Sequence, residues 1–108
     1  MQFLIIGLDG DDPEAKQRRL AARPKHIEMG DALLADGNLW YGAALFGDDG
    51  QMNGSMYLID FESEDKLHEW LSKEPYIIGD VWKTVEVRKA NVREPWQFNR
   101  PREFFENR

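Results

Sequence analysis

Four short runs of β-forming residues, interleaved with two helical segments, limit what this chain can fold into more than any other feature of its sequence. The runs are rich in aliphatic and aromatic residues and end at glycine, proline or acidic turns, which is typical of strands. They cover residues 2–8, 38–46, 55–61 and 81–87. The glycine-rich, acidic segment 47–54 joins the second run to the third, so these two are expected to form a hairpin.

The first helical segment, residues 13–36, carries a proline near its middle and meets Gly37, a natural helix stop. Leu20, Ile27 and Leu34 recur every seven residues and predict its buried stripe. Pro24 removes a helical hydrogen bond and clashes with the preceding turn. Two interpretations stay open: a helix kinked just before Pro24, or a main helix that begins at Pro24, where proline is favoured.

The second helical segment follows Ser63, which is placed to cap it, and ends before Pro75. Leu67, Trp70 and Leu71 supply its apolar face. The resulting order is βαββαβ. It predicts an α+β, ferredoxin-like domain in which a four-stranded antiparallel sheet carries both helices on one face.

Both faces of the strands are fairly apolar, so the sheet face that the helices do not cover is expected to be apolar as well. In the last run, the alternation puts Val81, Lys83, Val85 and Val87 on one face and Trp82, Thr84 and Glu86 on the other. An open apolar sheet face needs a cover. We therefore expect a homodimer, in which the sheet of a second copy covers this face.

The chain has 108 residues, which fits one domain and one core. We expect the domain to span residues 1–89 and a tail to follow over residues 90–108. The tail is rich in aromatic residues, and it is expected to pack on its own domain or on a neighbouring subunit. Its aromatic residues are Trp96, Phe98, Phe104 and Phe105.

Composition excludes several classes of function. The net charge of −6 argues against nucleic acid as a partner, because phosphate binding needs a basic surface. The absence of cysteine excludes disulfides and thiolate sites and fits a reducing cytoplasm, the expected location. No apolar run approaches the roughly 20 residues that a membrane span needs, and the N-terminus reads as a strand, not as a signal peptide. Two distant histidines make no credible metal site.

The strongest candidate for chemistry is the run that contains Arg19, Arg23 and His26. Spacings of four and three residues put two cations and a titratable imidazole on one helix face. Histidine is suited to acid–base work near neutral pH. If the main helix began at Pro24, its positive end and the two arginines would favour a neutral His26 that can accept a proton. The competing interpretation is an exposed basic stripe paired with nearby acids.

Four further residues accompany this candidate. Asp9 follows the first strand, where its carboxylate could orient the imidazole, although it could equally be an ordinary turn residue. Asp36 is a weaker partner, since ten residues from His26 place it on a different helix face. Ser55 could offer a hydroxyl to a ligand, and Tyr76 a phenol after the break at Pro75, or each could be structural.

Taken together, these pieces resemble the YciI family of YCII-related proteins, and the resemblance spans about residues 1–89. The stretches that carry it are the strand ending in Asp9, the RxxxRPxH run from Arg19 to His26, Gly37, Gly54-Ser55, Phe61-Glu62-Ser63 and Glu74-Pro75-Tyr76. The family's usual Asp-Pro-Tyr is Glu-Pro-Tyr here. The resemblance implies a ferredoxin-like fold that dimerises as a dimeric α+β barrel. It also implies a His–Asp pair in a crevice near the dimer interface, carried over as His26 and Asp9, with Ser55 and Tyr76 lining the same pocket.

The function implied by the resemblance is a cofactor-independent enzyme acting on a small polar or anionic molecule. One branch of the family is similar to an enzyme that removes chloride from a chlorinated hydroxyhydroquinone without metal or organic cofactor. His26 would move a proton, Asp9 would orient it, and Arg19 or Arg23 would hold an anionic group, as in an elimination or isomerisation. The alternatives are a non-catalytic small-molecule-binding dimer and a cofactorless monooxygenase.

Overall fold

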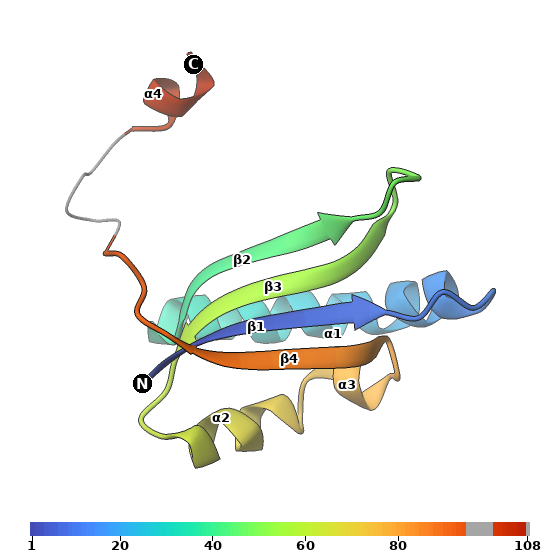
Figure 1. The fold of residues 1–108 in the computed structure, drawn as a ribbon, viewed down its shortest axis with the longest axis horizontal. Helices are drawn as coiled ribbons and strands as arrows, with labels where there is room; N and C mark the ends of the chain where they lie inside the picture. Colours follow the sequence, from blue (N-terminus) through green and yellow to red (C-terminus); the bar gives the residue numbers. More distant parts are fainter. Residues whose placement is uncertain (95–100, 108) are drawn as a thin grey trace.

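The structure is a computed structural model that describes residues 1–94 and 101–107. One antiparallel sheet has the strand order β2-β3-β1-β4 (Figure 1). The predicted βαββαβ order is confirmed, with a one-turn helix, α3, added before the last strand. The elements are β1 (Gln2–Asp9), α1 (Ala15–Asp36), β2 (Leu39–Phe46), β3 (Met52–Asp60), α2 (Glu64–Leu71), α3 (Pro75–Ile78), β4 (Trp82–Ala90) and α4 (Arg102–Glu106).

Helix α1 continues through Pro24. The interpretation in which a new helix begins at Pro24 is therefore wrong, and His26 lies in the interior of the helix, away from its positive end. The helix ends at Gly37, as predicted, and the positive φ of 83° at that glycine suits the left-handed conformation of a C-terminal cap.

The stripe of α1 that faces the sheet is not the predicted one. Leu20 and Leu34 are 69% and 54% exposed, and Ile27 is exposed as well. The buried stripe contains Arg19 and His26 instead, together with Ala15 and Leu33. It is the same seven-residue repeat displaced by one residue, which turns the face by about 100°. Periodicity identified the repeat, but the buried stripe is the one whose Arg19 and His26 pair with Asp9 at the end of β1 and Glu74 at the start of α3.

Strand β4 also differs from its predicted faces. Trp82 lies on the core side together with Val85 and Val87, although simple alternation separates them. The ladder with β1 changes register here, because Lys83 is an extra residue in β4. The Trp82 indole lies directly over Gly7 of β1, where a Cβ atom would come within 2.3 Å of the ring. Glycine at this position makes the room for the tryptophan.

The loop that joins β2 to β3 is shorter than predicted. Strand β3 begins at Met52, so only residues 47–51 connect the two strands. Ser63 caps α2 as predicted and accepts a hydrogen bond from the Lys66 N–H at 3.2 Å. The core lies between the sheet and all three helices α1, α2 and α3, and its largest fully buried members are Phe3, Ile5, Ile59, Leu67, Tyr76 and Val81.

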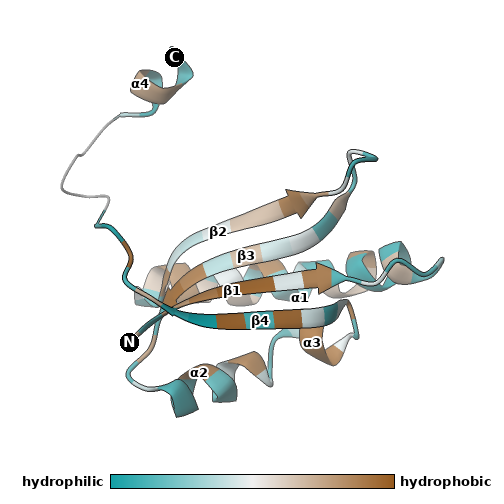
Figure 2. Ribbon diagram, viewed as in Figure 1, coloured by the Kyte–Doolittle hydropathy of each residue, from teal (hydrophilic) through white to brown (hydrophobic). Residues whose placement is uncertain are grey.

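The other face of the sheet is largely apolar over β1, β2 and β3, whereas β4 places Thr84, Glu86 and Arg88 on it. Because side chains alternate along a strand, the residues between the core positions point to this face, and they include Leu4, Ile6, Leu8, Tyr41, Met56 and Leu58. In Figure 2 the strongly hydrophobic colour lies along much of β1, whereas β2 is pale over most of its length and brown near its end. Among the described helices, none lies over this face in Figure 1, where α1 runs behind the strands.

The tail begins where β4 ends. The Val92 N–H donates to Gln2 Oε1 at 2.7 Å, which ties the start of the tail to β1. In α4, the rings of Phe104 and Phe105 pack edge to face with centroids 5.4 Å apart. Trp96 and Phe98 lie outside the described residues. The packing of the tail on the domain or on a partner stays a prediction.

Candidate functional site

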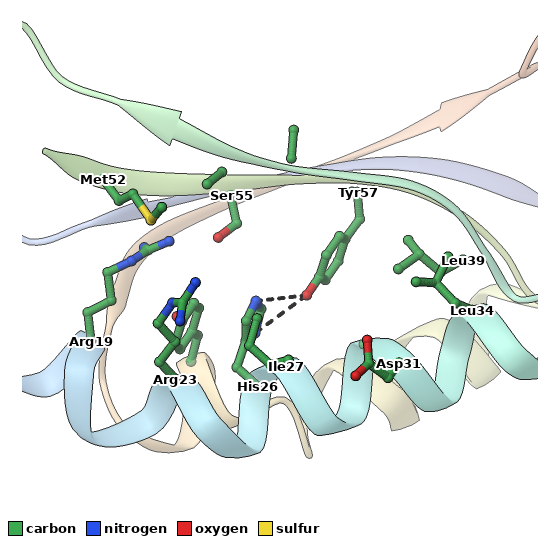
Figure 3. A pocket seen from close by; sticks show the side chains of 15 residues that line it. Arg19, Arg23, His26, Ile27, Asp31, Leu34, Leu39, Met52, Ser55 and Tyr57 are labelled. Atoms are coloured by element: carbon green, nitrogen blue, oxygen red, sulfur yellow. Dashed lines mark hydrogen bonds between the residues drawn. The ribbon is translucent and has the colours of Figure 1, made fainter. Parts of the chain in front are cut away.

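A cavity of about 230 Å³ lies between α1 and the β2–β3 side of the sheet. Figure 3 shows Arg19, Arg23 and His26 rising from α1 toward Ser55 and Tyr57 on β3. Strand β2 forms the remaining wall with Leu39 and with Gly42, Ala43 and Ala44, which have little or no side chain. The cavity is lined by Arg19, Arg23, His26, Ile27, Gly30, Asp31, Leu34, Leu39, Gly42, Ala43, Ala44, Met52, Ser55, Tyr57 and Tyr76.

His26 is held at Nδ1 by the carboxylate of Glu74. Nδ1 contacts Glu74 Oε1, and the Glu74 side chain is fully buried. The local sequence Glu-Pro-Tyr explains this placement. Glu74 is extended, as residues before proline prefer, Pro75 takes the first position of α3, and Glu74 Oε1 accepts the Tyr76 N–H at 3.2 Å as the helix cap. One carboxylate thus caps α3 and fixes the imidazole.

Two tyrosines hold the imidazole on its faces. The Tyr76 ring stacks on His26 with centroids 3.7 Å apart and planes 8° apart. The Tyr57 hydroxyl lies 3.0 Å from His26 Nε2 and 3.4 Å from Nδ1 (Figure 3). An oxygen at these two distances would collide with Cε1 if it lay in the imidazole plane, so it lies over the face that Tyr76 leaves open. The Tyr57 hydroxyl is the hydrogen-bond partner of Nε2, the nitrogen that Glu74 does not contact.

Burial sets the protonation of both phenols. It raises the pKa of Tyr57 far above the ordinary tyrosine value, and the negative charge of Glu74 adds to the effect. Burial raises the pKa of Tyr76 too, against the opposing pull of Arg19 and Arg23. Both phenols are therefore neutral at physiological pH, and each keeps an O–H to donate.

The two arginines differ in what they have left to offer a ligand. Arg19 is buried, and its Nη1 donates to both carboxylate oxygens of Asp9 at 2.9 Å. Its Nη2 donates to the Gly54 carbonyl at 3.3 Å, and its guanidinium lies 4.9 Å from the Tyr76 ring centroid. Arg23 is exposed beside the cavity and pairs with no acid of the described residues. The uncompensated cation of the cavity is Arg23.

The structure brings five of the six predicted site residues to one cavity: Arg19, Arg23, His26, Ser55 and Tyr76. Asp9 is the exception. The predicted contact between His26 and Asp9 is corrected, because Asp9 binds Arg19 and the carboxylate at His26 is that of Glu74. Asp36 is exposed at the far end of α1 and does not supply it either.

Sequence reasoning missed two residues of the site, Glu74 and Tyr57. Glu74 had a signal, since it belongs to the Glu-Pro-Tyr stretch that supports the family resemblance. Tyr57 had none, because an aromatic residue in an alternating strand is ordinary core. Within residues 1–94 and 101–107, no group of three or more acids or histidines is arranged to hold a metal ion. Nor does any helix in this part of the chain have the length and apolar character to cross a membrane.

Comparisons with known proteins identify the family of the chain. The family model described as the YCII-related domain matches residues 1–93. The comparison with curated proteins found no significant match. Among solved structures, the chain is similar to 5-chloro-2-hydroxyhydroquinone dehydrochlorinase (TftG) from Burkholderia phenoliruptrix, in complex with 2,5-dihydroxybenzoquinone. The identity is 25%, the TM-score is 0.73, and the alignment covers 84% of this chain and 94% of TftG.

Two further solved structures are more distant. A hypothetical protein from Pyrococcus horikoshii is 9% identical with a TM-score of 0.45, over 84% of this chain and 93% of that one. Protein Atu4242 from Agrobacterium tumefaciens is 18% identical with a TM-score of 0.47, over 88% of this chain and 98% of that one.

Proposed function

This chain belongs to the YCII-related domain family, and on that premise we propose that it is a cofactor-independent enzyme that moves a proton on a small anionic or polar molecule. The reaction class is elimination or isomerisation, in which a base removes a proton next to a leaving group or a developing enolate. The observation that carries the proposal is the His26–Glu74 contact on the wall of the cavity.

His26 is the proton-transfer group in this proposal. The carboxylate of Glu74 accepts the Nδ1 proton, so the neutral imidazole presents an unprotonated Nε2, the arrangement that a base needs. When Nε2 takes the proton from the ligand, the resulting imidazolium is balanced by the adjacent carboxylate. Stacking against Tyr76 and the hydroxyl of Tyr57 keep the ring from turning. Glu74 thus has the orienting role that the sequence had given to Asp9.

The ligand's negative charge is bound by Arg23 in this proposal, with the Ser55 hydroxyl as a second contact. Ser55 is nearly fully buried on the sheet side of the cavity. The charge of Arg19 is already largely neutralised by Asp9. Arg19 therefore has a structural role in this proposal, in which its guanidinium packs near the Tyr76 ring on the cavity wall. The Tyr76 hydroxyl is available as a donor to the ligand.

The substrate class to test first is a hydroxylated ring. TftG is a small-molecule enzyme whose structure is similar to this chain at 25% identity, and it binds 2,5-dihydroxybenzoquinone. The cavity of this chain suits a flat ring, because Gly42, Ala43 and Ala44 give β2 a low wall opposite α1. Gly42 also leaves room for Tyr57, because a Cβ atom added at residue 42 would lie 3.3 Å from the Tyr57 ring.

The test measures chloride release from 5-chloro-2-hydroxyhydroquinone and the affinity for 2,5-dihydroxybenzoquinone in the native chain and in His26→Ala. General base catalysis contributes about 10²- to 10⁴-fold in rate. We expect His26→Ala to lose turnover by that factor and to keep most of the affinity. A protein that only binds small molecules would show affinity without turnover, and a variant that keeps both would contradict the proposed site.

We further propose that the protein is a homodimer in which two open sheet faces pack together as a dimeric α+β barrel. The support is the apolar character of the face opposite the helices, with Leu8 and Tyr41 each more than 40% exposed in the single chain. Exposed apolar side chains that lie together on one sheet face are typical of interfaces between subunits.

A further inference from the structure

The cavity continues into a second hollow at one of its ends. Figure 3 shows Met52 on β3 across from Arg19 and Arg23 on α1 at this end, and Leu34 and Leu39 at the other. The adjoining surface groove, of about 370 Å³, shares Arg19, Arg23 and Met52 with the cavity. The cavity and the groove therefore adjoin each other at Arg19, Arg23 and Met52.

The groove is apolar and exposed. Its distinctive members are Leu20, which is 69% exposed, and Phe46, which is 63% exposed. Leu20 projects from α1 beside the buried Arg19, and Phe46 ends β2, so helix and strand form its two sides. Large apolar side chains gathered in a concave place next to a binding site are typical of a ligand subsite.

We infer that this groove, formed by Leu20, Phe46 and Met52, binds an apolar substituent of the ligand whose anionic ring occupies the cavity. The substrate class is then a small anionic ring that carries an alkyl or aryl side chain. This inference rests on the proposed function, which places the anionic group at Arg23.

Size and charge favour this occupant. The cavity of about 230 Å³ lies below the range of about 300–1,000 Å³ that is usual for ligand pockets, so a molecule larger than one ring has to extend out of it. The groove shares the cation of the site, Arg23, and Lys16 lies on its other border. Because Arg23 and Met52 line both hollows, a ring bound at Arg23 lies next to the groove that Leu20 and Phe46 line.

The test is a chain-length series. Affinity is measured for 2,5-dihydroxybenzoquinone and for its 3-alkyl derivatives from methyl to hexyl, by titration calorimetry on the full chain. A fully buried methylene contributes about 0.8 kcal/mol, or about 4-fold. Because the groove is open on one side, we expect about 2-fold tighter binding per methylene until the groove is filled.

Three variants locate the effect. In Leu20→Ser and Phe46→Ser we expect the chain-length gain to fall to less than half, while the affinity for the unsubstituted ring stays within about 2-fold. The matched control is Ile78→Ser, since Ile78 is 71% exposed on α3 and borders neither the cavity nor the groove. It should keep the full gain.

Each other outcome overturns the inference in a distinct way. A gain that persists in Leu20→Ser and Phe46→Ser is non-specific, and a gain lost in Leu34→Ser instead places the substituent at the opposite end of the cavity. A change in sedimentation coefficient for Phe46→Ser makes the groove an interface between copies. Affinity for the unsubstituted ring without any gain removes the groove and leaves the proposed function standing. Lack of affinity for every member of the series contradicts both.

Discussion

Glu74 and His26 are 48 residues apart in the chain, yet Glu74 Oε1 contacts His26 Nδ1, and the Glu74 carboxylate is fully buried. A buried carboxylate needs partners. Oε1 has two, the imidazole and the Tyr76 N–H, whereas Oε2 has none among the described residues. The carboxylate is therefore committed to the imidazole, and any chemistry of His26 depends on it.

Glu74→Gln should slow proton transfer without unfolding the chain. The amide oxygen can still accept the Tyr76 N–H, but a neutral side chain no longer stabilises an imidazolium. We expect a loss of about 10²-fold or more in kcat with little change in affinity for 2,5-dihydroxybenzoquinone. The comparison is Asp9→Asn, which leaves the Glu74–His26 contact in place. A larger loss of kcat in Asp9→Asn than in Glu74→Gln would return the orienting role to Asp9.

Asp9→Ala should destabilise the fold, because it leaves the buried Arg19 without its carboxylate. The side chains of Arg19 and Asp9 are 9% and 6% exposed. Removing one partner of a buried ion pair costs about 3–5 kcal/mol, which urea unfolding measures. Asp12→Ala is the matched control. Arg18 lowers the pKa of Asp12 well below its usual range, but this pair is only partly buried, so the free energy of unfolding should fall much less than in Asp9→Ala. Equal losses would show that the Arg19 pair is not buried in solution.

Gly7→Ala should be destabilising by about 1–3 kcal/mol, since the new methyl group would overlap the Trp82 indole and force it to move. Gly30→Ala is the opposite case. Its Cβ would lie 4.0 Å from the nearest atom, the Tyr57 hydroxyl, and alanine gains about 1 kcal/mol over glycine inside a helix. Thermal or urea unfolding should move the two variants in opposite directions. A neutral Gly7→Ala would mean that Trp82 does not occupy the space above β1.

Stability should fall at alkaline pH because of Tyr57. Its pKa is higher in the folded chain than in the unfolded chain, where it is about 10. Its contribution is thus fully present below about pH 10 and is lost as the pH rises further, by about 1 kcal/mol per pH unit. Tyr57→Phe has no phenol to ionise, so its free energy of unfolding should decline less steeply between pH 10 and 11. Identical slopes for the two proteins would contradict the burial of the Tyr57 hydroxyl.

Leu58→Glu should convert the proposed dimer into a monomer. Leu58 lies on the open sheet face between Leu4 of β1 and Tyr41 of β2, so a carboxylate there would be buried in the interface. Sedimentation of the native chain at micromolar concentration should give twice the mass of Leu58→Glu. Ile78→Glu places the same charge on an exposed residue of α3 and should remain dimeric. A native monomer would contradict the dimer.

Much of the fold could be predicted from local patterns. Each strand is an apolar run between turn residues. Ser63 caps the start of α2 and Gly37 caps the end of α1, and both caps depend only on residues within one helical turn. The stripe of α1 could not be predicted in the same way. The more apolar repeat is that of Leu20, Ile27 and Leu34. Helix α1 nevertheless buries Arg19 and His26, because these two side chains pair with the carboxylates of Asp9 and Glu74.

For the candidate site, the amino-acid pattern was enough to predict which reactive side chains lie on α1, and the resemblance to the YCII-related family placed His26 among them. Their partners depend on how the elements pack in three dimensions. Glu74 reaches His26 because Pro75 and α3 bend the chain back against α1, and Asp9 reaches Arg19 because β1 ends beside the first turns of α1. A hydrogen bond between residues far apart in the chain depends on the packing that brings their elements together. The spacing of the residues along the chain does not determine their distance in space.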